Sequence, residues 1–170
     1  MRPSAIKTSQ WQDPLDLLEL SGPLPVDLFL TFQVNQLSSA FERQWSRYMR
    51  DKAGVSLSEW RIMAMLQSGA HTFARIVELT EVNKALVHRS AKSLSGLGLI
   101  EITDTPGDAR STTMALTSKG QTLIRKIRPL ALARQKHFLS ALTAQERRLF
   151  YVAIEKLRTA AQEWDQSLKE

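Results

Sequence analysis

The segment from residue 100 to residue 117 constrains the fold of this chain more than any other. Ile100–Thr103 and Thr112–Leu116 each alternate apolar and polar side chains, as expected of short strands with one buried face. Pro106–Asp108 supplies turn chemistry between these two runs. The segment therefore predicts a β-hairpin, and Thr117 is expected to begin a helix directly after it.

Two predicted helices precede the hairpin and are separated by a short polar break. Thr72 is expected to cap the first helix, and Asn83 is expected to cap the second, which runs from Lys84 to Leu97. Both are also candidate DNA-binding residues. Apolar residues recur on one side of the second helix at spacings of three and four. Its outward side is basic and hydrogen-bonding, and it carries Lys84, Ala85, His88, Arg89 and Lys92. The order helix, turn, helix, hairpin indicates a winged helix-turn-helix. The alternative, a pair of surface helices with solvated lysines, is disfavoured once helices and hairpin are considered together.

The hairpin also carries an acid and a base two residues apart, Asp108 and Arg110. They lie at its tip or on its returning edge. An arginine on a protruding turn can enter a minor groove of DNA, and a nearby aspartate can hold the guanidinium by a bidentate pair. The alternative is an ordinary solvated hairpin with a turn aspartate.

Three segments of the chain resemble the MarR family of bacterial transcription regulators. They are LSEWRIMAMLQ at 57–67, NKALVHRSAKSLSGLGLIEIT at 83–103 and DARSTTMALTSKG at 108–120. The resemblance implies that the helix from Lys84 enters the major groove, and that Arg110, braced by Asp108, reaches the minor groove. This chain has Asn83 where an acid is frequent and Ala85 where a hydroxyl is frequent. Phosphate contacts at the start of this helix are therefore expected to differ in detail from those of the family.

The length and composition of the chain fit one compact subunit. A chain of 170 residues that is 43% hydrophobic can form one domain with a good core. We predict a mainly α-helical fold with a small β-hairpin wing. Residues 1–27 are expected to form an N-terminal arm, residues 57–117 the winged helix-turn-helix lobe, and residues 28–56 and 118–170 a helical dimerisation region, all within one integrated domain.

The formal net charge of +6 is spread unevenly along the chain. Residues 1–30 hold two basic and four acidic side chains, whereas residues 72–128 hold nine basic and five acidic ones. We therefore expect the basic excess to lie on the helix-turn-helix, where it suits a polyanionic partner.

The sequence argues against several other classes of site. Without cysteine, neither a disulfide framework nor a thiol redox switch can form. The three histidines, His71, His88 and His137, lack the spacing of a metal site, so no metal or other cofactor is expected. No nucleophile elbow or glycine-rich phosphate loop appears, so we expect no enzyme and no catalytic residue. The start of the chain has no long apolar core, and a cytoplasmic protein without membrane contact is expected.

Long predicted helices flank the lobe. The first runs from Leu28 to about Asp51 with an apolar stripe rich in aromatic residues, and Gly54 closes it. Ser58 is expected to cap the next helix. In the helix after the hairpin, Pro129 should cause a bend, because proline removes one backbone donor and clashes with the preceding turn.

The last predicted helix begins with a capping box formed by Thr143 and Glu146. Its apolar side carries Leu149, Ala153, Leu157, Ala160, Trp164 and Leu168. Apolar stripes this long at both ends of the chain exceed what one small lobe can cover, so a symmetric homodimer is expected. The alternative is a monomer folded on its own long helices.

The resemblance also implies an effector site between the dimerisation helices and the DNA-binding lobe. The residues expected there are Phe41, Trp45, Tyr48, Trp60, Arg61, Met63, Ala64 and His71. An aromatic stripe at helical spacing is core more often than pocket. The neighbouring cations Arg47, Arg61 and His71 favour a pocket, because an apolar slot with a cation at its rim suits an aromatic carboxylate.

The sequence is therefore interpreted as a dimeric, sequence-specific DNA-binding transcription regulator that recognises a palindromic operator. We expect a repressor of a catabolic or efflux operon, released by a small aromatic ligand or its coenzyme A thioester. A ligand-independent architectural DNA-binding protein is the alternative within this class. An enzyme and a protein-interaction module are the alternatives outside it.

Overall fold

The computed structural model describes residues 13–17, 26–105 and 108–169. The N-terminal part holds α1 (Pro14–Leu17), η2 (Val26–Leu28), α2 (Leu30–Tyr48) and η3 (Met49–Ala53). The central part holds α3 (Leu57–Met65), η4 (Leu66–Ser68), β1 (His71–Thr72), α4 (Phe73–Thr80), α5 (Lys84–Gly96), β2 (Ile100–Thr105) and β3 (Asp108–Leu116). Two long helices follow, α6 (Ser118–Ser140) and α7 (Ala144–Ser167).

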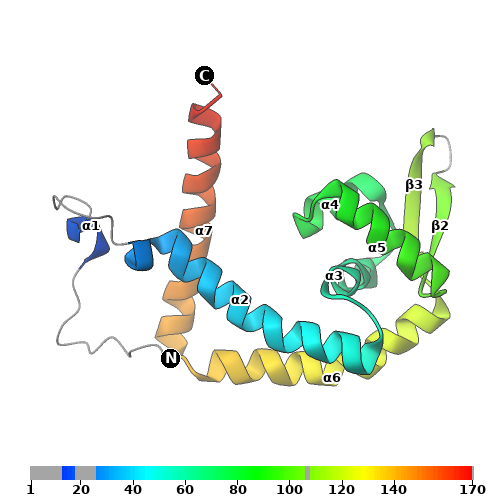
Figure 1. The fold of residues 1–170 in the computed structure, drawn as a ribbon, viewed down its shortest axis with the longest axis horizontal. Helices are drawn as coiled ribbons and strands as arrows, with labels where there is room; N and C mark the ends of the chain where they lie inside the picture. Colours follow the sequence, from blue (N-terminus) through cyan, green and yellow to red (C-terminus); the bar gives the residue numbers. More distant parts are fainter. Residues whose placement is uncertain (1–12, 18–25, 106–107, 170) are drawn as a thin grey trace.

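The helices and strands divide into a lobe and a helical frame (Figure 1). The lobe contains α3, α4, α5 and the hairpin of β2 and β3. Helix α6 leaves the base of the hairpin and runs beside α2, and α7 projects from the far end of α6. Helix α6 continues through Pro129 and changes direction along its length. The mainly α-helical fold with a β wing is confirmed.

The wing is a β-hairpin, as predicted, but it belongs to a three-stranded antiparallel sheet. Its strand order is β1-β3-β2. Ile100 pairs with Leu116 and Ile102 pairs with Met114, and the register shifts between Asp104 and Thr105. The third strand, β1, pairs with β3 through His71 and Met114. It was not predicted, and it ties the start of α4 to the wing.

Side-chain caps fix the starts of most helices where the sequence predicts them. The Thr72 hydroxyl accepts from the Arg75 N–H, and the Asn83 side chain accepts from the Ala85 N–H. Thr143 and Glu146 form the predicted capping box. Gly54 ends the first long helical segment in a left-handed conformation, with φ of 67°.

The predicted cap at Ser58 is wrong. Helix α3 begins two residues earlier, with Ser56 as the N-cap. Ser56 and Glu59 form a capping box, in which the Ser56 N–H donates to Glu59 Oε2 at 2.5 Å. Glu59 stands three residues after Ser56, which is the spacing that a capping box requires. Ser58 therefore lies inside the helix, where its hydroxyl is free to bond elsewhere.

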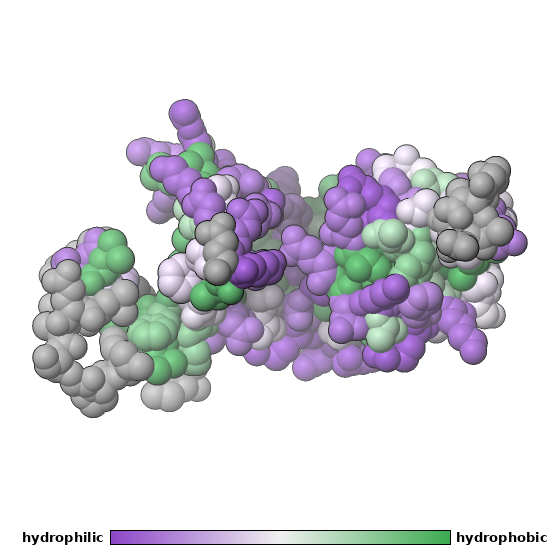
Figure 2. All heavy atoms as spheres, turned by 90° about the horizontal axis from the view of Figure 1, so that it is seen from above, coloured by the Kyte–Doolittle hydropathy of each residue, from purple (hydrophilic) through white to green (hydrophobic). Residues whose placement is uncertain are grey.

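The core lies in the lobe and at its junction with α6. The largest fully buried side chains are Met49, Ile62, Met63, Ile76, Val87, Leu94, Met114 and Ile127. Helix α2 contributes one buried residue, Trp45, and α7 contributes none. Figure 2 shows hydrophobic side chains at the surface where α2 begins, and Leu30 and Val34 are more than half exposed there. The helical frame therefore leaves much of its apolar surface uncovered by this chain.

The basic excess lies on α6, and the expectation that it lies on the helix-turn-helix is wrong. Residues 72–117, which include α4, α5 and the wing, hold five basic and five acidic side chains. Helix α6 holds six lysines and arginines and no acidic residue. Its formal charge of +6 equals the net charge of the whole chain. No ion pair between described side chains involves these six cations. Within the described ranges, no helix is both long enough and apolar enough to cross a membrane.

Candidate DNA-binding helix and effector cavity

Helix α5 presents a polar side to solvent and packs its other side into the core. Lys84, Ala85, His88, Arg89 and Lys92 are all exposed, as predicted from their spacing. Val87, Ser90, Ala91 and Leu94 are buried on the opposite side. Asn83 is exposed at the N-terminus of the helix, where the backbone N–H groups favour an anion.

Two of the predicted DNA-contacting residues are engaged within the lobe. The ring of His88 stacks on Phe73 of α4, with ring centroids 3.8 Å apart and an interplanar angle of 28°. This contact fixes the imidazole toward α4, although the residue as a whole is exposed. Thr72 is half-buried in β1 and its hydroxyl caps α4. Its first role is therefore structural.

The wing residues Asp108 and Arg110 lie at the start of β3. Asp108 pairs with Thr105 across the end of the hairpin, so both residues stand near its tip, as predicted. Their side chains lie outside the described part of the structure. The pairing of Asp108 with Arg110 remains a prediction.

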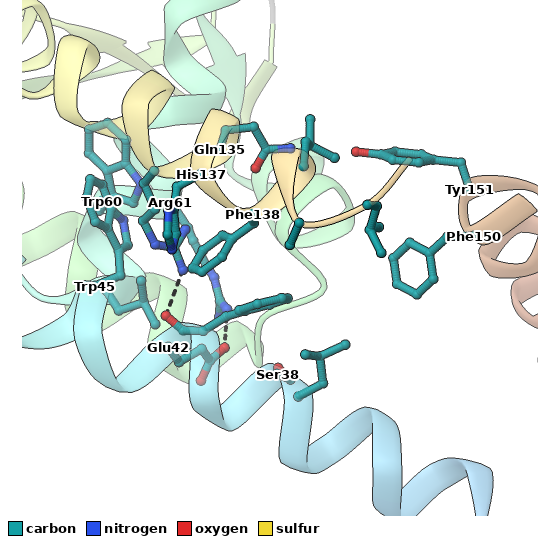
Figure 3. A pocket seen from close by; sticks show the side chains of 17 residues that line it. Ser38, Glu42, Trp45, Trp60, Arg61, Gln135, His137, Phe138, Phe150 and Tyr151 are labelled. Carbon is teal, nitrogen blue, oxygen red and sulfur yellow. Dashed lines mark hydrogen bonds and ion pairs between the residues drawn. The ribbon is translucent and has the colours of Figure 1, made fainter. Parts of the chain in front are cut away.

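An open cavity of about 710 Å³ lies between α2, α3, α6 and the start of α7 (Figure 3). Four of the predicted effector residues line it: Phe41, Trp45, Trp60 and Arg61. The rest of the wall comes mainly from the C-terminal helices. Arg134, His137 and Phe138 belong to α6, and Phe150 and Tyr151 belong to α7. These residues were not predicted.

The other four predicted effector residues do not line this cavity. Met63 is fully buried in the core, because it points to the lobe side of α3. Ala64 lies one turn of α3 beyond the cavity. Tyr48 packs on the far side of Trp45, with ring centroids 5.5 Å apart. His71 belongs to β1, and its Nε2 lies 3.0 Å from the Ser68 hydroxyl oxygen.

The two arginines in the cavity wall differ in electrostatic environment. Arg61 forms an ion pair with Glu42, so its charge is partly neutralised. Arg134 donates a hydrogen bond to the Phe41 carbonyl oxygen at 2.7 Å. Its guanidinium lies 5.2 Å from the Trp45 ring centroid and 4.8 Å from that of Phe138. Burial lowers the pKa of Arg134, but an arginine stays protonated in proteins.

Arg134 also has a hydrogen-bond donor without a partner among the described residues. This donor is its Nε, which is buried. No described carboxylate pairs with Arg134. The cavity therefore combines an aromatic wall with a cation that forms no ion pair among the described residues, because the carboxylate in the wall, Glu42, pairs with Arg61. This combination suits an aromatic anion.

Comparison with known proteins agrees with the winged-helix fold. The sequence model of the MarR family matches residues 53–111, which span α3, the helix-turn-helix and most of the wing. Over this segment the chain is similar to the MarR family. Members of this family are DNA-binding regulators rather than enzymes. Comparison with curated proteins gives no significant match.

The chain is similar in structure to several solved transcriptional regulators. One is a MarR/EmrR family transcriptional regulator from Acinetobacter sp. ADP1, with 27% identity, a TM-score of 0.75, and coverage of 81% of this chain and 98% of that one. Another is BpsR of Bordetella bronchiseptica, whose DNA binding is regulated by 6-hydroxynicotinic acid; it has 19% identity and a TM-score of 0.58, and the match covers 72% and 98% of the two chains. A third is a mutant MarR from E. coli complexed with operator DNA, with 15% identity, a TM-score of 0.68, and coverage of 75% and 92%. The last two show the fold alone.

Proposed function

We propose that this protein is a homodimeric repressor of the MarR family that binds a palindromic operator and leaves it when a small aromatic acid occupies the cavity beside Arg134. The observation that carries this proposal is the unpaired Arg134 guanidinium in an aromatic cavity between the lobe and the helical frame.

The DNA-binding part of the proposal is supported by α5 and the wing. The exposed cations Lys84, Arg89 and Lys92 lie on one side of a helix whose other side is anchored in the core. A helix anchored in this way can enter a major groove without rearrangement. Lys84, at the N-terminus, is suited to a phosphate, and Arg89 is suited to a base edge. The E. coli MarR that this chain resembles in fold was solved with operator DNA.

The dimer is supported by the surface of α7. None of its residues is buried by this chain. Large apolar side chains at its surface are more than 40% exposed: Leu149, Tyr151, Leu157, Trp164 and, directly after the helix, Leu168. Large apolar side chains left exposed along one helix favour an interface. A second copy would cover it symmetrically and would place two α5 helices on successive turns of a palindrome.

The effector is expected to place its ring among the aromatic side chains and its carboxylate against Arg134. A carboxylate there would complete the coordination of the buried guanidinium. Regulation of BpsR by 6-hydroxynicotinic acid, which is an aromatic acid, supports this chemical class. A coenzyme A thioester of such an acid is the alternative effector, with its acyl group among the aromatic side chains of the open cavity.

The test combines a gel shift on a palindromic fragment from the upstream region of the gene with tryptophan fluorescence. Benzoate, 6-hydroxynicotinic acid and their hydroxylated relatives are added as probes. Binding should quench Trp45 and Trp60 and release the DNA. Arg134→Met and Trp60→Ala should abolish the response to the probe and leave the affinity for DNA unchanged. Arg128→Met is the control: it removes an exposed cation from α6, the helix of Arg134, and should change neither the response nor the DNA affinity.

A panel that leaves both fluorescence and DNA binding unchanged would refute the effector proposal. The alternative, a ligand-independent architectural DNA-binding protein, would then be preferred. Failure to distinguish the upstream fragment from random DNA would refute operator recognition itself.

A further inference from the structure

One turn of α3 contacts both the effector cavity and the DNA-binding helix. Leu57, Trp60 and Arg61 line the cavity. Ser58, on the adjacent side of the same turn, faces α5 and lies 2.9 Å from Ser90, oxygen to oxygen. Figure 1 shows α3 between the helical frame and α5. A shift of this turn would therefore change both the cavity wall and the contact with α5.

The contact between Ser58 and Ser90 is part of a short polar chain. The Ser56 hydroxyl caps α3 by accepting from the Glu59 N–H at 3.3 Å, and it lies 3.1 Å from the Ser58 hydroxyl. The chain ends at Ser90, which is 4% exposed. It connects the N-terminal cap of α3 to the buried side of α5.

Ser90 is surrounded by apolar neighbours on α5. Val87, Ala91 and Leu94 are buried with it. Apolar contacts are non-directional and tolerate small displacements between packed helices. A hydrogen bond has a narrow range of length and angle, and a buried hydroxyl that loses its partner is costly. The polar chain is therefore the contact between α3 and α5 that responds most steeply to a small displacement.

We propose that the Ser58–Ser90 hydrogen bond transmits occupancy of the cavity to α5, so that both serines are positioning residues for the effector response. This inference rests on the proposed function. An acid bound between Arg134 and Trp60 would move the turn that carries Ser58, and α5 would follow through Ser90. Arg89, which immediately precedes Ser90, would then lose its register with the DNA.

The first experiment needs neither an effector nor an operator. Hydrogen exchange of residues 85–95 is measured by mass spectrometry in four full-length proteins: wild type, Leu57→Ala, Ser90→Ala and the double variant. Leu57→Ala loosens the cavity side of the turn. With Ser90 present it should speed exchange in α5 by about fivefold, a coupling within the usual range for linked sites. With Ser90→Ala the same change should have little effect.

Ser58→Ala breaks the same hydrogen bond from the half-buried α3 side, and it replaces Ser90→Ala in the cycle if that variant does not fold. Ser95→Ala is the matched control, because Ser95 is an exposed serine of the same helix. Equal effects of Leu57→Ala with and without the hydrogen bond would overturn the proposal, since independent sites give additive changes.

The second experiment uses 6-hydroxynicotinic acid and benzoate as probes. In wild type and Ser95→Ala, a probe that binds should weaken operator affinity. In Ser58→Ala and Ser90→Ala, the probe should bind within twofold of wild type, while its effect on operator affinity falls by about fivefold. An undiminished effect would also overturn the proposal. If no probe binds, the effector proposal fails, but the exchange cycle still decides whether the serines link the two helices.

Discussion

Among the described glycines, Gly120 alone has no room for a Cβ, and its substitution gives a sharp test of the fold at the base of the wing. A Cβ built on Gly120 would lie 2.0 Å from the Leu99 carbonyl oxygen and 3.1 Å from the Leu116 Cδ2 atom. The Leu99 carbonyl cannot easily move away, because it accepts a hydrogen bond from the Thr117 N–H at 3.1 Å. Thr117 itself caps α6 by accepting from the Gly120 N–H.

The expected cost of Gly120→Ala follows from two opposing terms. Alanine is intrinsically favoured over glycine in a helix by about 1 kcal/mol. Overpacking a close contact costs about 1–3 kcal/mol, and more when the neighbour is backbone. Because the overlap here is with a backbone oxygen, the steric cost should exceed the helix preference for alanine, and Gly120→Ala should destabilise the protein by about 2 kcal/mol. For a chain of this length that corresponds to a fall in Tm of about 4–8 °C.

The assay is thermal and urea unfolding followed by circular dichroism, with all proteins at one concentration because a dimer unfolds in a concentration-dependent way. Gly96→Ala is the matched control. Gly96 also lies in a helix, but a Cβ there would meet nothing within 4 Å, so alanine should stabilise by up to about 1 kcal/mol. A Gly120→Ala protein as stable as wild type would refute the close packing of α6 against Leu99.

Four further predictions concern the DNA-binding surface, the dimer and the last helix. Arg110→Ala should weaken operator binding strongly and Asp108→Ala less so; affinity within twofold of wild type for Arg110→Ala in a gel shift would reject the wing assignment. Arg89→Ala should relax base preference, whereas Lys84→Ala should weaken binding to all sequences and reduce the salt slope by about one; equal losses on specific and random DNA for Arg89→Ala would reverse its role. Leu157→Glu should shift the protein toward monomer in sedimentation, whereas the adjacent Lys156→Glu should not; a stable Leu157→Glu dimer would exclude this face of α7 from the interface. The hydrogen bonds from the Thr143 backbone and side chain hold the pKa of Glu146 below its ordinary value, so their contribution to stability should be complete above the ordinary glutamate pKa and lost as the pH falls through the lowered one. Unfolding of Glu146→Gln and wild type across the acid range checks this, because the gap between the two proteins should close as the pH falls.

Local patterns predicted the helices and the wing well where a side chain marks a boundary. Thr72, Asn83 and Thr143 each stand directly before an apolar-periodic run and carry a side-chain oxygen that can cap a helix. The error at Ser58 was avoidable, because Ser56 has a glutamate three residues later and Ser58 does not. Strand β1 could not be predicted. It has two residues, too few for a periodic signal, and its partner Met114 is distant in the sequence.

The effector cavity shows the limit of sequence reasoning more clearly. Phe41, Trp45, Trp60 and Arg61 were predicted because the resemblance to the MarR family implies an effector site between the dimerisation helices and the lobe, and because cations lie beside these aromatic residues in the sequence. Arg134 donates a hydrogen bond to the carbonyl of Phe41, which is 93 positions away in the sequence. No local sequence pattern predicts that contact. Its only signal is the spacing of Arg134 and Phe138, which places a cation and an aromatic ring on one side of a helix.

The concentration of positive charge on α6 has a kinetic consequence for the proposed DNA binding. Residues 72–117 are electrically balanced, so the field that draws a duplex toward the protein originates on a helix about 34 Å long beside the lobe. The Debye length is about 30 Å at 0.01 M salt and about 8 Å at 0.15 M. In dilute buffer the whole of α6 therefore attracts an approaching duplex, and at physiological salt that attraction is confined to its own surface. The rate of capture should then fall steeply with salt, while the number of counterions released in the bound complex stays fixed by the few cations of α5 and the wing.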